Sequence, residues 1–138
     1  MKFYKSLLVA AFVISAFGQG FAQSSTQADA TRKTASYLAE VYKGMPEFSE
    51  ADRIAAFAEM LGRIEVREEA PVGNEDYIKL SSIALVDKYN PEIRRDNHQN
   101  FQPENFNPFK YFLDFHPKKE RKYRVDNTAY VIVISPKK

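Results

Sequence analysis

The chain has 138 residues, the length of one ordinary globular domain, and its formal net charge is +2. Apolar residues make up 44% and charged residues 28%, a composition that argues against collagen, coiled coils and wholesale disorder. Cysteine is absent, which excludes disulfide scaffolds, thiolate metal sites and cysteine nucleophiles.

The first 22 residues have the pattern of a secretory signal peptide. Lys2 and Lys5 precede a nearly all-apolar run over residues 6–17, and small residues follow at Gly20 and Ala22. We predict cleavage after Ala22 and export to the periplasm or the extracellular space, as part of a bacterial envelope. The apolar run is shorter than the ~20 residues that a membrane-spanning helix needs, so we predict no transmembrane segment after cleavage.

Cleavage would change the charge of the chain. Residues 23–138 hold 18 basic and 18 acidic side chains. The charge is unevenly distributed, because residues 23–78 carry a net −5 and residues 79–138 a net +5. Export and a zero net charge both argue against nucleic acid as a partner.

Residues 27–43 are predicted to form the first helix. The segment Thr26 to Asp29 fits a capping box, and apolar residues follow it at helical spacing. Gly44 and Pro46 then supply stop signals.

Residues 50–61 are predicted to form a second helix. Ser49 and Asp52 fit another capping box, and Gly62 is suited to a left-handed C-terminal position. The short connection between the two helices predicts an antiparallel αα-hairpin.

The rest of the chain alternates strand patterns with turns. Strands are predicted at about 63–67, 77–86, 109–115, 121–125 and 128–134. The last three are expected to form an antiparallel meander, with Asp126-Asn127 as a hairpin turn. The many β-branched residues of the last strand mark it as central or buried on both faces. Between the strands, residues 87–108 are rich in proline and asparagine but contain apolar residues, so we expect an irregular segment that packs.

These elements predict one α+β domain over residues 23–138. The αα-hairpin would pack on an antiparallel sheet that ends in the three-stranded C-terminal meander, because neither helix can bury its apolar stripe alone.

Candidate catalytic residues are sparse. His98 and His116 each end an Asp-x-His triplet, a spacing that could hold a metal or orient a histidine base. Both triplets lie beside turn signals, where these residue types are common. Paired carboxylates occur only around the polar loop 68–76, and no serine lies in a nucleophile motif. We therefore predict no catalytic residues, no metal and no cofactor.

Two other features are candidates for binding. Phe101 and Phe106 lie on the irregular segment and are either core residues or an apolar binding patch. A basic cluster surrounds one predicted turn and contains Lys118, Lys119, Arg121, Lys122 and Arg124, with Lys137 and Lys138 beyond the paired strand. This cluster is either a solvated turn or a surface that attracts anions.

The sequence thus favours a small exported, non-enzymatic binding or interaction module whose ligand is unknown. The binding candidates are Phe101, Phe106, Lys118, Lys119, Arg121 and Lys122. The expected partner is a protein or an anionic surface of the envelope. The alternatives are a structural or assembly component of a bacterial envelope complex, or a small hydrolase that uses an Asp–His or a carboxylate pair.

Overall fold

The computed structural model describes residues 26–73 and 77–138. The predicted signal peptide lies outside the described residues, and so does the carboxylate pair Glu75-Asp76. The chain divides into two compact units, residues 1–33 and residues 34–138. None of the described helices is long and apolar enough to cross a membrane.

Residues 26–42 are helical, as predicted. The boundary between the two units falls after Lys33, so each unit contains part of this helix. In the first unit, Arg32 Nη1 pairs with Asp29 Oδ1 at 3.0 Å. In the second unit, Leu38 and Val41 are buried on the helix. Gly44 has a φ of +69°, the left-handed conformation expected just after a helix, so the predicted stop signal is confirmed.

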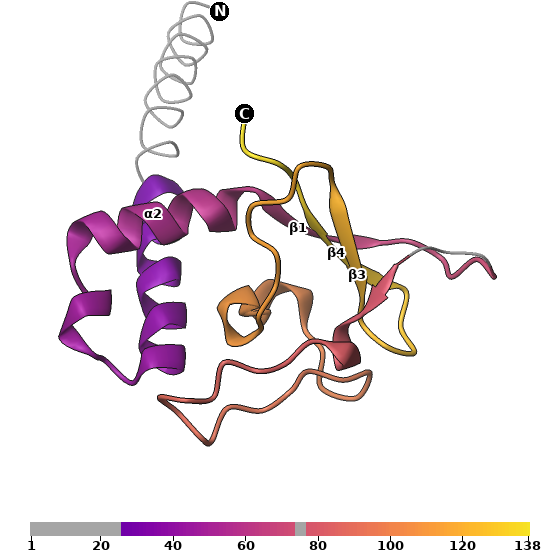
Figure 1. Ribbon diagram of the computed structural model, residues 1–138, viewed down its shortest axis with the longest axis horizontal. Coiled ribbons are helices and arrows are strands. Elements are labelled where there is room, and N and C mark those ends of the chain that lie inside the picture. Colours follow the sequence, from indigo (N-terminus) through magenta and orange to yellow (C-terminus); the bar gives the residue numbers. More distant parts are fainter. Residues whose placement is uncertain (1–25, 74–76) are drawn as a thin grey trace, which may run out of the picture. The chain divides into compact units, whose positions relative to one another are not determined.

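The second unit contains the other helix and the strands that the structure describes (Figure 1). The helix is α2 (Ala51–Gly62), and the strands are β1 (Ile64–Glu68), β2 (Ile78–Lys79), β3 (Arg121–Arg124) and β4 (Tyr130–Ile134). Short 3-10 turns are η1 (Pro46–Phe48), η2 (Leu80–Ser82), η3 (Pro103–Asn105) and η4 (Pro108–Lys110). The predicted α+β class is confirmed.

The predicted antiparallel αα-hairpin is wrong, since α2 runs across residues 34–42 instead of alongside them (Figure 1). The connection contains η1, and the rings of Tyr42 and Phe48 stack with their centroids 3.6 Å apart. This stacking stabilises the bend of the chain between the two helices.

The predicted end signals of α2 are also wrong. The hydroxyl of Ser49 donates to the carbonyl of Pro46 at 2.8 Å, and Glu50 occupies the N-cap without a side-chain bond. Gly62 stays within the helix, and Arg63 follows it with an ordinary φ of −96°. Ser49 therefore closes η1 instead of capping α2.

The sheet has the order β1-β4-β3-β2, and it is mixed. β4 pairs antiparallel with both β1 and β3, whereas β2 pairs parallel with β3. The prediction that the last strand is central is confirmed, because Val131 to Ile134 are all at most 1% exposed.

The predicted three-stranded meander is wrong, because residues 109–115 do not join this sheet. β2 occupies the edge of β3 that they would have used. The segment pairs instead with residues 84–86, through a bridge between Leu85 and Tyr111 and a hydrogen bond of 3.0 Å from Phe112 N–H to the Ala84 carbonyl. The predicted strand 77–86 is correspondingly reduced to the two residues of β2, followed by η2.

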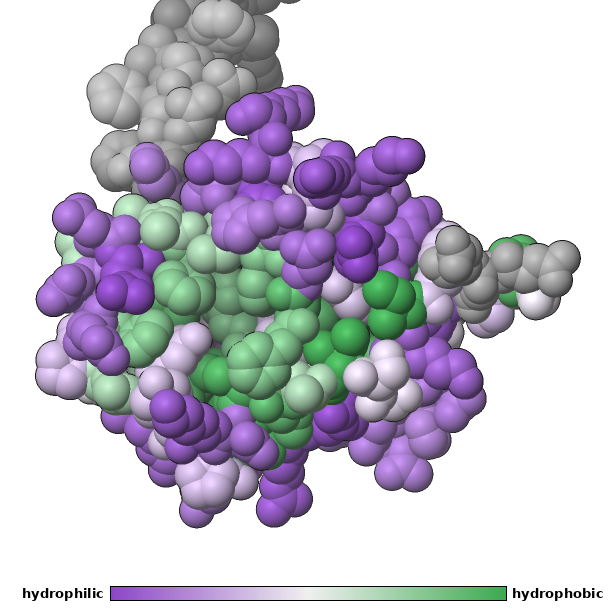
Figure 2. Space-filling model, viewed as in Figure 1, coloured by the Kyte–Doolittle hydropathy of each residue, from purple (hydrophilic) through white to green (hydrophobic). Residues whose placement is uncertain are grey.

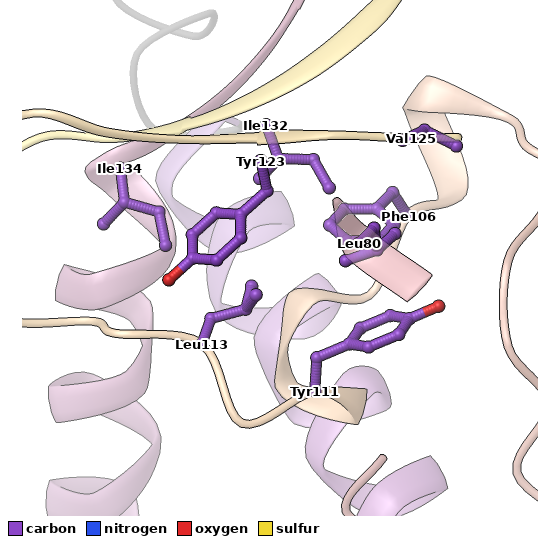
Figure 3. Close-up of a cluster of buried hydrophobic side chains, with 8 residues drawn as sticks. All are labelled: Leu80, Phe106, Tyr111, Leu113, Tyr123, Val125, Ile132 and Ile134. Atoms are coloured by element: carbon purple, nitrogen blue, oxygen red, sulfur yellow. The ribbon is translucent and has the colours of Figure 1, made fainter. Parts of the chain in front are cut away.

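The core lies between the sheet and the irregular part of the chain (Figure 3). Tyr123, Ile132 and Ile134 point from the sheet toward Tyr111 and Leu113 of the segment that follows η4. A second cluster packs α2 and residues 34–42 around Phe109. The segment 87–108 therefore packs, as expected, although it has little regular structure.

Polar contacts fasten this irregular segment. Asn90 Nδ2 donates to the Glu40 carbonyl at 2.8 Å, and the buried Asn107 donates to the Tyr37 carbonyl at 3.0 Å. The contact from Asn90 supplies a partner in the last turn of the helix, where carbonyls lack one within the helix itself.

Candidate functional site

The loop that precedes β3, residues 114–120, carries most of the predicted basic cluster. Asp114 Oδ1 accepts a hydrogen bond from His116 N–H at 3.1 Å, a local turn typical of aspartate. Asp114 N–H donates to the Tyr123 hydroxyl at 3.0 Å, and Pro117 is buried. The base of the loop is therefore fixed, while Lys118 and Lys119 are exposed.

An open hollow of about 670 Å³ lies against this loop. It is lined by Ile78, Asp114, His116, Lys118, Lys119, Glu120, Arg121 and Lys122. All four of the predicted basic binding residues thus border one hollow, which we call the basic hollow.

These four cations have different partners. Arg121 Nη2 lies 3.4 Å from Asp114 Oδ2, and Lys122 Nζ lies 3.1 Å from Glu69 Oε1. Lys118 and Lys119 have no ion pair with any residue that the structure describes. The positive charge available to a ligand is therefore concentrated on the two exposed lysines.

Lys122 is held on the face of the sheet opposite the core. Its Nζ lies 3.2 Å from the Tyr77 hydroxyl, which itself donates to Glu69. The hydrogen bond from Tyr77, followed by that from Lys122, holds the pKa of Glu69 below its ordinary value. The contacts with Tyr77 and then Glu69 raise the pKa of Lys122 in turn. Each group favours the charged form of its partner.

These side chains belong to a wider ion-pair layer on that face. It joins Glu65, Arg67, Glu69, Glu120 and Lys122. Val131 and Val133 lie in register with Arg67 and Lys122 and are 0% and 1% exposed. The apolar stems of long charged side chains can cover such valines while their heads remain in water.

The predicted aromatic candidates lie elsewhere, against the core. Phe106 is 5% exposed, and Phe101 is half-buried with its ring 5.6 Å from that of Phe106 (Figure 3 shows Phe106). These rings contribute to packing, and neither lines the basic hollow.

The two histidines lie in different surroundings. His116 lines the basic hollow, whereas His98 is exposed in the turn over residues 97–100. No group of three or more His, Asp or Glu side chains within residues 26–73 and 77–138 is arranged to hold a metal ion.

Sequence reasoning missed several residues that shape the site. Glu69 and Tyr77 form hydrogen bonds with Lys122, although they lie 53 and 45 positions earlier in the chain. Arg63 donates to the carbonyls of Phe115 and Ser135, at 2.7 and 3.0 Å. No local pattern in the sequence indicates these long-range contacts.

One side of the molecule also has apolar surface in its middle (Figure 2). Among the described residues, the most exposed large apolar side chains are Val72 and Phe112, at 63% and 65%. Apolar atoms make up a large share of the surface of any folded protein, so this area does not by itself define a second site.

No protein-family model matches the chain, and no curated protein or solved structure is significantly similar to it.

Proposed function

We propose that this protein is a small exported binding module that takes an anionic ligand in the basic hollow. The observation that carries the proposal is the position of Lys118 and Lys119, exposed and without an acidic partner among the described residues, on the rim of a hollow of about 670 Å³. The pattern of residues 1–22 supports export.

The chemistry of the rim suits binding of phosphate, sulfate or carboxylate groups. Lysine offers a compact charge with three donors, and Arg121 offers a guanidinium that Asp114 engages from one side only, at 3.4 Å. A bound anion would displace only water from the two lysines. At Arg121 it would compete with the carboxylate of Asp114. Because the hollow is open to solvent, the attraction is screened by salt over about 8 Å at physiological ionic strength.

Binding, and not covalent catalysis, is the use these lysines favour. A lysine nucleophile or base requires a desolvated setting in which its amine can lose its proton. Lys118 and Lys119 are instead exposed.

Calorimetry with inorganic tripolyphosphate tests the proposal directly. The wild-type protein is expected to bind, and raised salt is expected to weaken the binding. The double variant K118Q/K119Q should bind much more weakly. A matched control, K79Q/K88Q, removes the same charge from two exposed lysines outside the basic hollow and should bind as wild type does. Equal binding by K118Q/K119Q and wild type would show that the basic turn is merely solvated.

A further inference from the structure

A second hollow, of about 460 Å³, borders the C-terminal residues. Its lining comes from the end of α2, the start of β1 and residues 135–138, including Arg63, Lys137 and Lys138. We call it the terminal hollow. Nothing in the proposed function so far uses it.

The sheet register places the two hollows at the same end of the sheet. Ile134 of β4 pairs with Arg121 on one side and with Ile64 on the other. The start of β3, the end of β4 and the start of β1 therefore lie side by side. In Figure 1 the loop before β3 and the C-terminus both lie above the sheet, and Figure 2 shows hydrophilic side chains along that edge.

Arg63 lines the terminal hollow and connects it to the loop that carries the basic hollow. One guanidinium nitrogen, Nη1, bonds both to the Phe115 carbonyl, in the loop of the basic hollow, and to the Ser135 carbonyl, in the terminal hollow. Glu59 also lines the terminal hollow, and the hydrogen bond that it accepts from Arg63 lowers its pKa. The side chain of Arg63 is only 12% exposed, so this junction is a fixed part of the fold.

The acids of the terminal hollow are already paired. Glu59 binds Arg63 at 2.8 Å, and Glu65 binds Arg67 at 3.0 Å. Lys137 and Lys138 are exposed and, within the described part of the chain, form no ion pair. Each hollow thus presents two lysines whose charges the protein does not neutralise.

We propose that the two hollows form one track for a linear polyanion, with Lys118 and Lys119 binding one stretch of the chain and Lys137 and Lys138 another. This proposal rests on the proposed anion-binding function. A single small anion reaches only one pair of lysines, whereas a polymer can contact both. Once the polymer is bound at one pair, its binding at the second is intramolecular, which raises the overall affinity. Two hollows suit a chain lying in them better than a flat membrane surface.

The test compares tripolyphosphate with long-chain polyphosphate, at equal phosphate concentration. The wild-type protein should bind the long chain about 10²-fold more tightly, the lower range of gains from joining two sites. K137Q/K138Q should lose this gain and keep its affinity for tripolyphosphate. K118Q/K119Q should weaken both, and the control K79Q/K88Q should weaken neither. The salt dependence for the long chain should be steeper in the wild type than in either hollow variant, because fewer counterions are released by the variants.

The outcomes separate the two proposals. If K137Q/K138Q binds the long chain as tightly as wild type while K118Q/K119Q loses tripolyphosphate, the anion site stands and the track is overturned. If neither polyphosphate binds, both proposals are overturned. Preferential binding to phosphatidylglycerol vesicles over long-chain polyphosphate would overturn the track in favour of a membrane surface.

Discussion

Two groups of basic side chains border the four-stranded sheet, and they differ in what surrounds each charge. On the face opposite the core, Lys122 and Arg67 lie within 4.0 Å of carboxylates and belong to a layer over buried valines. At the end of the sheet, Lys118 and Lys119 are exposed beside a hollow and form no ion pair with a described residue. The first group is part of the fold, and the second is available to a ligand.

Proximity to carboxylates, more than residue type, decides which role a lysine takes. At Lys122 an incoming anion must displace Glu69, whereas at Lys118 it displaces only water. The same contrast extends to cations inside the molecule. Lys110 Nζ binds Asp96 Oδ2 at 2.8 Å, with both side chains at most 15% exposed. Paired cations should therefore matter for stability, and unpaired ones for binding.

The largest expected effect is at the buried pair. Asp96→Ala would leave Lys110 without its carboxylate and would also remove an acceptor of the Tyr111 hydroxyl, which lies 2.8 Å from Asp96 Oδ2. Removing one member of a buried pair costs about 3–5 kcal/mol, since the remaining charge is uncompensated. Urea unfolding should show this loss. The double variant D96L/K110M should be more stable than D96A, because it leaves no buried charge behind. A single variant with nearly wild-type stability would contradict the assignment of this pair as structural.

Arg63→Ala should have the next largest effect. The substitution removes the guanidinium that joins the Phe115 and Ser135 carbonyls and binds Glu59. Hydrogen bonds involving a charged group contribute about 1.5–3 kcal/mol, so a loss of about 2 kcal/mol is expected in urea unfolding. Arg94→Ala is the control, because that arginine is exposed and its side chain makes no described ion pair. Equal stabilities of the two variants would show that Arg63 does not hold the junction together.

A smaller effect is expected at Glu69, and it should depend on pH. Its pKa in the folded protein is lowered, chiefly by the hydrogen bond from Tyr77 and then by that from Lys122. The stabilisation is therefore complete above the unfolded value of about 4.3 and is lost as pH falls through the folded value. Glu69→Gln should be less stable than wild type at neutral pH, and the difference should narrow in acid. Thermal unfolding across pH measures this, with Glu47→Gln as the control. A difference that is constant with pH would contradict the proposed role of the charge.

Local pattern predicted the elements whose residues interact with near neighbours. Helical residues 26–42, α2 and β1 follow from periodicity, and the β3–β4 hairpin follows also from its turn residues. The alternation of residues 109–115 matches the burial of Tyr111 and Leu113, which are 0% and 6% exposed, beside Phe112 at 65%, but it fails at Lys110, which is only 8% exposed in η4. It could not predict the partner of this segment, because an extended chain alternates whether it joins β3 or residues 84–86.

The clustering of the basic residues was predictable from the sequence, but their ion pairs were not. The density of basic residues around one turn indicated a cluster, and the structure places Lys118, Lys119, Arg121 and Lys122 around one hollow. Lys122 differs from the nearby lysines because it forms an ion pair with Glu69, a long-range contact that the local sequence does not indicate. The terminal hollow likewise depends on the pairing of β1 with β4, which are distant in the sequence and are not joined by a hairpin turn that would fix their register.

The smallest expected effect on stability is at the lysines with the largest expected effect on binding. Lys118 and Lys119 are exposed and make no ion pair that the structure describes, so K118Q/K119Q should unfold within about 0.5 kcal/mol of wild type. Lys122→Gln, on the strand that follows this loop, is the comparison, and it should be measurably less stable because it leaves Glu69 without its ammonium partner. If the order were reversed, Lys118 and Lys119 would be structural, and a loss of tripolyphosphate binding in K118Q/K119Q would reflect unfolding instead of a lost contact. Measuring urea unfolding and binding on the same samples therefore determines which group of lysines binds anions and which group stabilises the sheet.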